Sequence, residues 1–384
     1  MGFNFNTAPS IISAPGAIAR LGEIAQGKLG ARVLVVTDPG LVKLGVIARG
    51  LEALEKAGVA CAIFDQVEAD PPDHCVLAAA KAASDFDATG VIGFGGGSSL
   101  DVAKLAALLA KSPQALTDAY GVGRARGPRL PLVLVPTTAG TGSEATAVAV
   151  VTTGAAEKMG VVSPTILPDV ALLDPELTLG LPPHATAVTG VDAMVHAIEA
   201  FTSINPNNSP ISRTLAREAL ALLGANIRTA VMRGDDLSAR EAMLNGSLLA
   251  GMAFANASVG AVHALAYPLG GHFHLSHGLT NALVLSHVLR FNMSACAPAY
   301  AELAPIVFAD APQGSVEARA NFFVEAMAEL CAELGVPLRL RDTGVPQDSL
   351  PMLARDAMNQ TRLLVNNPRV VTEADALAIY EAAF

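Results

Sequence analysis

The sequence predicts an α/β domain followed by an all-helical domain, with the boundary near residue 183. Short apolar runs alternate with helical patterns over the first half, whereas the second half holds long helical segments and no convincing strand. Strand and helix in alternation are typical of crossover units on a parallel sheet. The turn-rich passage DPELTLGLPP separates the two patterns. We therefore expect domains over 1–183 and 184–384, joined in one compact body without a flexible linker.

The elements of the first half follow from runs of apolar residues and their spacing. Short apolar runs predict strands at 32–38, 61–67, 90–96 and 130–138. Longer segments with apolar residues at helical spacing predict helices at 41–57, 75–84 and 100–111. The order of strand and helix predicts a parallel sheet in this domain.

The composition favours a protein with a large core that acts on small molecules. Of the 384 residues, 52% are hydrophobic and only 16% are charged. The net charge is −10 without a basic run, and four tyrosines with no tryptophan give no stacking platform, so we expect neither nucleic acid nor membrane partners. The start, MGFNFNTAPSIISAPG, lacks the features of a signal peptide, and the four cysteines form no paired motif. A cytoplasmic location is therefore expected.

Four residues of the second half carry metal-ligand side chains. Asp192 and His196 are four apart in the helical segment GVDAMVHAIEAF, so both project from one face about one turn apart. His263 and His277 fall within 242–289, a stretch without Asp, Glu, Lys or Arg. Because neutral imidazole is a ligand and a charged one is costly to bury, this setting indicates a metal centre. For each residue alone, a hydrogen-bonded core side chain is the alternative.

One carboxylate and three imidazoles suit a divalent transition metal and leave a position for substrate. His287 lies in the same uncharged stretch, after His277. We expect it to pack against neighbouring helices and not to bind metal.

Three segments of the first half suit a dinucleotide. GFGGGSSLD follows an apolar strand and opens a helix, where backbone amides can approach a diphosphate, although an ordinary turn is the alternative. Asp38 ends a strand in VVTDPG, where a carboxylate accepts hydrogen bonds from a ribose diol and repels an added phosphate. This favours NAD over NADP, while a simple turn acid is the alternative. PTTAGTGSE follows another strand, at the sheet edge where ligands bind.

Taken together, the chain resembles the iron-dependent, or group III, alcohol dehydrogenases over essentially its whole length. The matching stretches include GGGSSLDVAK, PTTAGTGSEAT, LLDPELTLGLPP, GVDAMVHAIEAF and VHALAYPLGGHFHLSHGLTNALVLSHVLRFN, in the family's order and spacing. The resemblance implies a nucleotide-binding α/β domain and a helical domain, an architecture shared with dehydroquinate synthase. It implies Fe²⁺ at Asp192, His196, His263 and His277, with Zn²⁺ as the alternative metal, and a homodimer or larger homo-oligomer. The cofactor contacts that it implies are Asp38, Gly96, Gly97, Ser98, Asp101, Thr137, Thr138, Lys158 and Thr178.

The predicted function is an NAD-dependent, metal-dependent alcohol dehydrogenase that interconverts a small primary alcohol or diol and its aldehyde. Hydride passes between the substrate carbon and the nicotinamide, and the metal supplies Lewis acidity. A reductase like maleylacetate reductase is the alternative. A lyase like dehydroquinate synthase is less favoured, because its phosphorylated substrate calls for the Lys and Arg that 242–289 lacks. A dinucleotide sensor with a structural metal is the non-enzymatic alternative.

One departure from the family bears on the proton route. The family commonly has a second histidine in VHxxxH, and this chain has Tyr267 there. A phenol with a reference pKa of about 10 accepts a proton less readily near neutral pH than an imidazole near about 6.5. We therefore expect Tyr267 to orient substrate or cofactor, and His272 or His274, which precede His277, to carry the proton. Surface histidines are the alternative. Phe254 is expected to line the substrate pocket, with core packing as its alternative.

Overall fold

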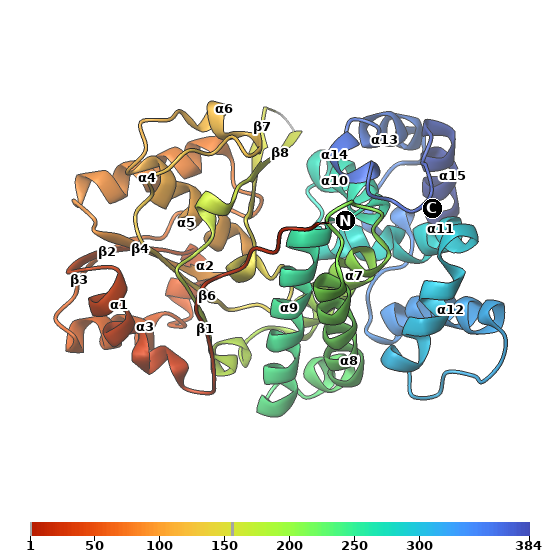
Figure 1. The fold of residues 1–384 in the computed structure, drawn as a ribbon, viewed down its shortest axis with the longest axis horizontal. Helices are drawn as coiled ribbons and strands as arrows, with labels where there is room; N and C mark the ends of the chain where they lie inside the picture. The colour runs from red at the N-terminus through yellow and green to blue at the C-terminus, as the bar shows by residue number, and fades with distance from the viewer. Residues whose placement is uncertain (1, 155–156) are drawn as a thin grey trace. The chain divides into compact units, whose positions relative to one another are not determined.

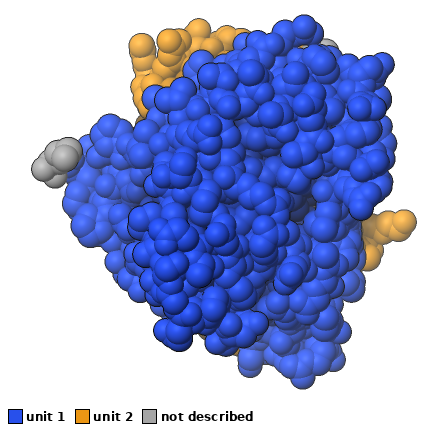
Figure 2. Space-filling view, turned by 90° about the vertical axis from the view of Figure 1, so that its right-hand side faces the viewer, with its two compact units in different colours: residues 1–5, 139–141, 181–384 blue, residues 6–138, 142–180 orange. Residues whose placement is uncertain are grey.

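The computed structural model describes residues 2–154 and 157–384, and the chain divides into two compact units. One unit contains residues 6–138 and 142–180, and the other contains the segment up to Phe5, residues 139–141 and residues 181–384; Figure 2 colours them separately. The first unit is α/β and the second is helical, which confirms the predicted fold class. For the domain limits we propose 1–183 and 184–384, with the two short segments added to the helical domain.

The α/β unit is built on a sheet that has six parallel strands among the described residues (Figure 1). Their order is β1-β9-β6-β4-β2-β3. The strands are β1 (Ile11–Ser13), β2 (Arg32–Val36), β3 (Ala60–Phe64), β4 (Gly90–Gly95), β6 (Leu132–Pro136) and β9 (Val170–Leu173). The chain passes from β2 to β3 on one side and then crosses to β4 on the other. The topological switch point of the sheet therefore lies between β2 and β4.

Both faces of this sheet are buried under helices. Along β2, Val33 and Val35 belong to one apolar cluster, and Leu34 and Val36 belong to another. Successive side chains of a strand point to opposite faces, so each strand contributes to both layers and its sequence is a continuous apolar run. The helices are α1 (Leu21–Lys28) and α3 (Ala48–Lys56) for the first layer, and α4 (Asp73–Asp85) and α5 (Gly97–Leu109) for the second.

The prediction of one continuous helix over 41–57 is wrong, because the segment forms two helices. The chain forms α2 (Pro39–Lys43) and α3 with Gly45 between them. Gly45 has a φ of 71°, in the left-handed region, so the first helix ends there. The apolar spacing on the two sides had suggested one uninterrupted helix.

A second, smaller sheet was also missed. It has the order β5-β8-β7, with β5 (Gly121–Val122), β7 (Val148–Thr153) and β8 (Glu157–Val162). Strand β5 is only two residues long and β8 mixes polar residues and glycine, so neither has a clear strand pattern, whereas β7 (VAVVTT) is rich in β-branched residues and carries a strand signal that was overlooked. Short helical elements also occur in this unit: α6 (Leu116–Ala119) and 3₁₀ turns at Ala17–Arg20, Ser143–Ala145, Pro164–Ile166 and Pro175–Thr178.

The other unit has helices and no strand in residues 181–384. The helices are α7 (Pro183–Thr202), α8 (Pro210–Met232), α9 (Leu237–Ala257), α10 (Ala261–Phe273), α11 (His277–Val307), α12 (Val316–Glu333), α13 (Leu350–Ala357), α14 (Thr361–Leu364) and α15 (Glu373–Ala383), with 3₁₀ turns at Leu340–Thr343 and Gln347–Ser349. Helix α7 packs against α8, α9 and α11 and is buried among them. Taken singly, none of the described helices is long and apolar enough to span a membrane; α9 and α10 reach that length only as a pair bent by 104°.

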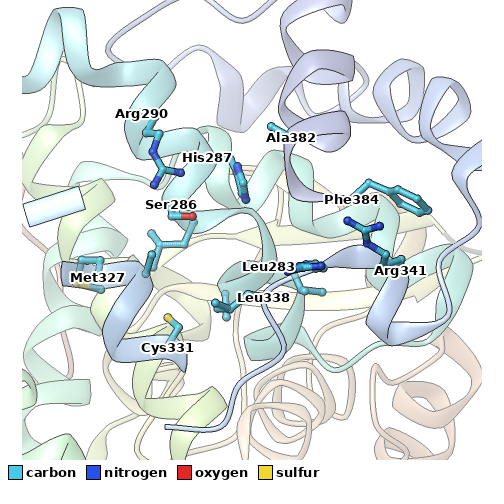
Figure 3. A pocket seen from close by; sticks show the side chains of 14 residues that line it. Leu283, Ser286, His287, Arg290, Met327, Cys331, Leu338, Arg341, Ala382 and Phe384 are labelled. Carbon is cyan, nitrogen blue, oxygen red and sulfur yellow. The ribbon is translucent and has the colours of Figure 1, made fainter. Parts of the chain in front are cut away.

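A cavity of about 260 Å³ lies in the helical unit (Figure 3). Its walls come from α11, α12, α15 and the segment before Leu340. His287 lies half-buried in the wall, and burial together with Arg290 lowers the pKa of its imidazole. The described lining includes none of the site residues that the sequence singled out. The predicted metal ligands of this unit therefore lie outside the cavity.

Candidate metal and cofactor sites

Helix α7 carries two of the four predicted metal ligands. Asp192 and His196 stand one turn apart on it and are 2% and 4% exposed. The helix is apolar on most of its surface, so its packing between other helices carries this polar pair into the core. Asp192 Oδ2 lies 3.9 Å from His196 Nδ1.

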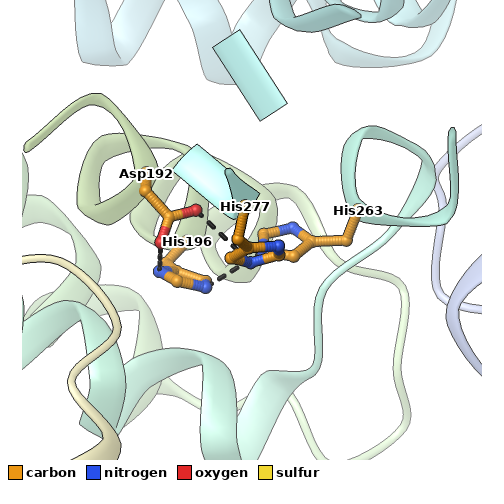
Figure 4. Close-up of side chains that lie close together, drawn as sticks. All are labelled: Asp192, His196, His263 and His277. Carbon is orange, nitrogen blue, oxygen red and sulfur yellow. Dashed lines mark hydrogen bonds and ion pairs between the residues drawn. The ribbon is translucent and has the colours of Figure 1, made fainter. Parts of the chain in front are cut away.

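The other two predicted ligands come from neighbouring helices. His263 lies in the first turn of α10, and His277 is the first residue of α11. One donor atom from each of Asp192, His196, His263 and His277 lies within 4.8 Å of the other three (Figure 4). The His277 side chain is 34% exposed, whereas the other three are buried, so solvent reaches the cluster at His277. The structure thus brings together four residues that are up to 85 positions apart, counting from 192 to 277.

Burial sets the charge state of this cluster. It lowers the pKa of His196 to about 3, although the nearby Asp192 opposes the shift. Burial works against ionisation of Asp192 too, but the surrounding imidazoles and the Asn281 amide outweigh it and lower the pKa of this carboxyl. A neutral imidazole beside a carboxylate is the charge pattern of a metal site.

The nitrogen atoms of the cluster also fit a cation. His263 Nε2 and His196 Nε2 are 3.0 Å apart, and Asp192 Oδ1 lies 3.6 Å from His277 Nε2. His196 Nδ1 is buried and has no hydrogen-bond partner. Buried polar atoms are normally paired within the protein, so donors that face one another point to an outside partner. The donor set, three imidazoles and one carboxylate, suits a divalent transition metal ion.

Sequence reasoning missed two polar residues that contact these side chains. Glu199 Oε2 lies 2.6 Å from His263 Nδ1. Asn281 Nδ2 donates to Asp192 Oδ1 at 2.6 Å and lies 3.2 Å from His263 Nε2. Helical spacing is the signal that points to both: Glu199 follows Asp192 by seven residues on α7, and Asn281 follows His277 by four on α11.

Two aromatic residues border the cluster. The half-buried Phe254 ring, from α9, stacks on His196 with 4.3 Å between centroids and 17° between planes. Tyr267, one turn after His263 on α10, lies 6.0 Å from His277 and 6.5 Å from His263, centroid to centroid. Both aromatic rings therefore lie against imidazoles of the cluster.

His272 and His274, the predicted proton carriers, lie on the surface. His272 Nε2 is 2.7 Å from Asp356 Oδ2. His274 follows the end of α10 in the left-handed conformation, with a φ of 54°, as a helix-terminating residue. Among the described contacts, neither side chain touches the four candidate ligands, whereas Tyr267 lies beside two of them.

The predicted cofactor residues all lie in the α/β unit. Asp38, Gly96 and Thr137 follow the carboxyl ends of β2, β4 and β6, which are neighbours in the sheet, so the three lie along one edge at the switch point. Asp38 Oδ1 accepts a hydrogen bond from the Leu41 amide at 3.0 Å and caps α2. Thr138 lies beside Gly96, with its side chain 3.6 Å from the point that a Cβ on Gly96 would occupy.

In the glycine-rich turn, Gly95 is required by the backbone conformation and by close packing. Gly95 has a φ of 152°, and a Cβ there would lie 2.6 Å from Ser99 Oγ. Gly96 precedes α5 as its N-cap, and Gly97 and Ser98 form its first turn. Because residue 96 has no side chain, a ligand can come close to the backbone amides at the start of α5.

The three remaining cofactor candidates are tied to other protein groups. Asp101 accepts hydrogen bonds from Ser143 Oγ at 2.6 Å and from the Val150 amide at 2.9 Å. Lys158 pairs with Asp70 at 2.8 Å. Thr178 is buried, and its hydroxyl donates to the Pro175 carbonyl. In the structure these residues connect loops of the unit, and their predicted contacts with a cofactor stay predictions.

Known proteins match both halves of the chain. The family model "Iron-containing alcohol dehydrogenase" matches residues 8–175, and "Fe-containing alcohol dehydrogenase family, C-terminal" matches residues 186–384. The long-chain-alcohol dehydrogenase 1 of Geobacillus thermodenitrificans is 41% identical over 93% of this chain and 91% of its own. A solved 1,3-propanediol oxidoreductase covers 100% of both chains with 36% identity and a TM-score of 0.95. The sulfoacetaldehyde reductase of Bifidobacterium kashiwanohense, solved with NAD⁺, covers 100% of this chain and 99% of its own with 30% identity and a TM-score of 0.87.

Proposed function

The chain belongs to the iron-containing alcohol dehydrogenase family, and from this premise we propose that it interconverts a small primary alcohol or diol and its aldehyde with NAD. As a member it is an oxidoreductase that acts on CH–OH groups. The observation that carries the proposal is the convergence of one carboxylate and three imidazoles in a buried cluster. The family match favours this reaction over the maleylacetate reductase and dehydroquinate synthase alternatives.

We assign the metal to Asp192, His196, His263 and His277. A divalent ion held there supplies Lewis acidity, which stabilises negative charge on the substrate oxygen. The donor set accepts several divalent ions, so iron is proposed from the family and zinc is the alternative. The neutral state of His196 keeps a lone pair available for the ion.

For the dinucleotide we propose the edge of the sheet at β2, β4 and β6. The Gly95–Gly97 turn offers amides to the diphosphate, and Asp38 faces the ribose. A relative with 30% identity was solved with NAD⁺. The charge of Asp38 favours NAD over NADP, because it repels a phosphate on the ribose.

For the substrate we propose a neutral alcohol that contacts Phe254. No Lys or Arg occurs from 242 to 289, and the two cations that flank this stretch are engaged by other groups. The Arg240 guanidinium is bonded to Thr186 Oγ1 and to the Gly234 and Leu181 carbonyls, and Arg290 pairs with Glu325 on the surface. An anionic substrate would therefore lack a counter-charge on these segments. One relative acts on sulfoacetaldehyde, so that anionic aldehyde is the sharpest competitor in a substrate panel.

The proton route is proposed to use His272 or His274, with Tyr267 orienting the substrate. We expect His272→Ala or His274→Ala to lower kcat/KM and shift its pH profile, with a milder change in Tyr267→Phe. Metal content has to be equal in all three variants. If both histidine variants match the wild type and Tyr267→Phe is inactive, the tyrosine is the catalytic residue; its place beside His277 makes this the competing outcome.

We further propose a cytoplasmic homodimer or larger homo-oligomer, and light scattering on the purified protein measures the assembly. The function itself is tested on protein purified anaerobically. We expect about one Fe²⁺ or Zn²⁺ per chain and NADH formation with small alcohols or diols, and a higher kcat/KM with NAD than with NADP. Tight NAD binding without turnover across the alcohol and aldehyde panel would instead indicate a dinucleotide sensor.

A further inference from the structure

Glu199 lies behind the proposed metal ligands and touches one of them. It is 7% exposed and stands on α7, on the face that carries Asp192 and His196. Its Oε2 lies 2.6 Å from His263 Nδ1, and its Oε1 accepts a hydrogen bond from the Val262 amide at 2.7 Å. The carboxylate therefore binds two adjacent residues in the first turn of α10 and leaves neither oxygen without a partner.

The hydrogen bonds around His263 select one tautomer of its ring. A carboxylate only accepts, so Nδ1 must carry the hydrogen that lies toward Glu199. On the other side of the ring, Asn281 Nδ2, which only donates, lies 3.2 Å from Nε2. Glu199 thus requires a protonated Nδ1, and Asn281, whose two N–H groups are shared among Asp192 Oδ1, His263 Nε2 and His277 Nε2, favours a lone pair on His263 Nε2. That lone pair lies 3.0 Å from His196 Nε2, in the centre of the cluster.

We propose that Glu199 is a positioning residue for the metal: it holds His263 as the tautomer whose Nε2 can bind the ion, and it fixes the plane of the ring. This rests on the proposed metal role of His263. Outer partners of this kind also raise the basicity of the ligating nitrogen, and their loss typically weakens metal binding by about 10–100-fold.

The substitution Glu199→Gln tests the proposal because the amide offers one acceptor to two donors. The Val262 amide cannot give up its hydrogen, so the side-chain oxygen of glutamine should bond to it. The NH₂ group then faces His263 Nδ1, which must accept, and the ring hydrogen moves to Nε2. The cap on α10 survives in this variant, but the ligand atom is blocked.

The measurement is metal affinity of the apo protein, by competition with a chromophoric chelator for Zn²⁺ and Co²⁺. We expect Glu199→Gln to bind at least about tenfold more weakly and to change the visible spectrum of the Co²⁺ form, which reports the ligand field. Glu199→Asp, which keeps the carboxylate, should recover part of the affinity. Glu325→Gln, an acid that pairs with Arg290 on the exposed surface, is the matched control and should bind like the wild type.

The outcomes separate this proposal from the proposed function. Wild-type protein that binds no metal would refute the metal site itself. If the wild type binds metal, and Glu199→Gln binds it with equal affinity and an unchanged Co²⁺ spectrum, the role of Glu199 alone is refuted. This holds even if the variant unfolds at a lower temperature. Should Glu199→Gln not fold, ¹⁵N spectra of histidine-labelled apo wild type decide: a protonated Nδ1 on His263 supports the proposal, and a protonated Nε2 overturns it.

Discussion

Two buried polar clusters of this protein, one in each unit, find their partners in opposite ways. In the α/β unit, Lys104 is fully buried, and its ammonium group donates to Ser143 Oγ and the Val148 carbonyl, both at 2.6 Å, and to Thr146 Oγ1 at 3.1 Å. In the helical unit, by contrast, two imidazole nitrogens face each other at 3.0 Å, and His196 Nδ1 has no hydrogen-bond partner. A polar cluster that satisfies itself holds a structure together, whereas one in which metal-ligand atoms of four side chains converge and a buried nitrogen stays unpartnered is arranged for a ligand.

The largest effect is expected when a member of the converging cluster is removed. His263→Ala should weaken metal binding by more than about 100-fold, since loss of an outer partner alone costs about 10–100-fold. Metal analysis and kcat/KM with an alcohol and NAD measure the effect. His287→Ala is the matched control, because this histidine lies in the same uncharged stretch but lines the separate cavity. Full metal content and activity in His263→Ala would contradict the assignment.

A substitution in the Lys104 cluster should lower the free energy of unfolding and leave the metal affinity of the protein unchanged. Lys104→Met keeps an unbranched side chain that is one atom shorter, and it leaves Asp101, which lies 3.3 Å from Lys104 Nζ, without its counter-charge. Removing one partner of a buried pair costs about 3–5 kcal/mol, and we expect this loss in urea unfolding. The exposed Lys111→Met is the control. The contrast between the two clusters would be wrong if Lys104→Met lost less than about 1 kcal/mol of unfolding free energy. It would also be wrong if the variant lost metal and kept its stability.

The α/β unit also contains buried polar atoms without a hydrogen-bond partner, on Thr37, Tyr120 and Glu144, and the last of these groups titrates in an accessible pH range. Glu144 is 1% exposed, its Oε1 has no hydrogen-bond partner, and burial raises its pKa from 4.5 to about 7, with Lys104 opposing the shift. The folded state therefore keeps a proton that the unfolded state releases near pH 4.5, and stability falls as pH rises from there through 7.

Glu144→Gln stays neutral in both states and removes this dependence. The variant should match the wild type below pH 4.5 and exceed its free energy of unfolding by up to about 3 kcal/mol above pH 7. Urea unfolding at pH 4.5 and pH 8 measures the difference. An equal difference at both pH values would show that the carboxyl does not titrate between the two states.

The smallest predicted effect concerns Asp38, which caps α2 and for which we propose a contact with the ribose. Asp38→Ser keeps an acceptor for the Leu41 amide but removes the charge, while Asp38→Gly removes both. Both variants should lose preference for NAD by roughly five- to tenfold, mainly by improving NADP use, since on the order of 1 kcal/mol of repulsion is involved. The ratio of kcat/KM for the two cofactors measures this. A wild-type preference for NADP would overturn the role of Asp38.

Residues whose neighbours lie close in sequence were predictable, and residues defined by distant contacts were not. Strand β4 and helix α5 follow from their apolar patterns, and the Asp192–His196 pair follows from helical spacing. The break at Gly45 was missed because the apolar residues on both sides keep a helical spacing. Strand β8 was missed because EKMGVV lacks strand periodicity and finds its partner β7 only through pairing.

The candidate site shows the same limit. Glu199 on a helix is expected to face solvent when it is considered alone, and only the fold reveals its contact with His263, 64 residues away. His272 and His274 precede His277 in sequence, yet one pairs with Asp356 on the surface and the other ends a helix. Nearness in sequence to a metal ligand therefore did not predict nearness in space.

The segment before Phe5, which belongs to the helical unit, constrains the order of events during synthesis. The Asn4 amide donates to Asn207 Oδ1, and Asn207 Nδ2 donates to the Asn4 carbonyl, both at 2.8 Å and across 203 positions. At a translation rate of roughly 5–20 residues per second, the first residues wait about 10–40 seconds for this partner. The α/β unit can begin to fold during that interval, but Asn4 cannot form these two hydrogen bonds until Asn207 has left the ribosome.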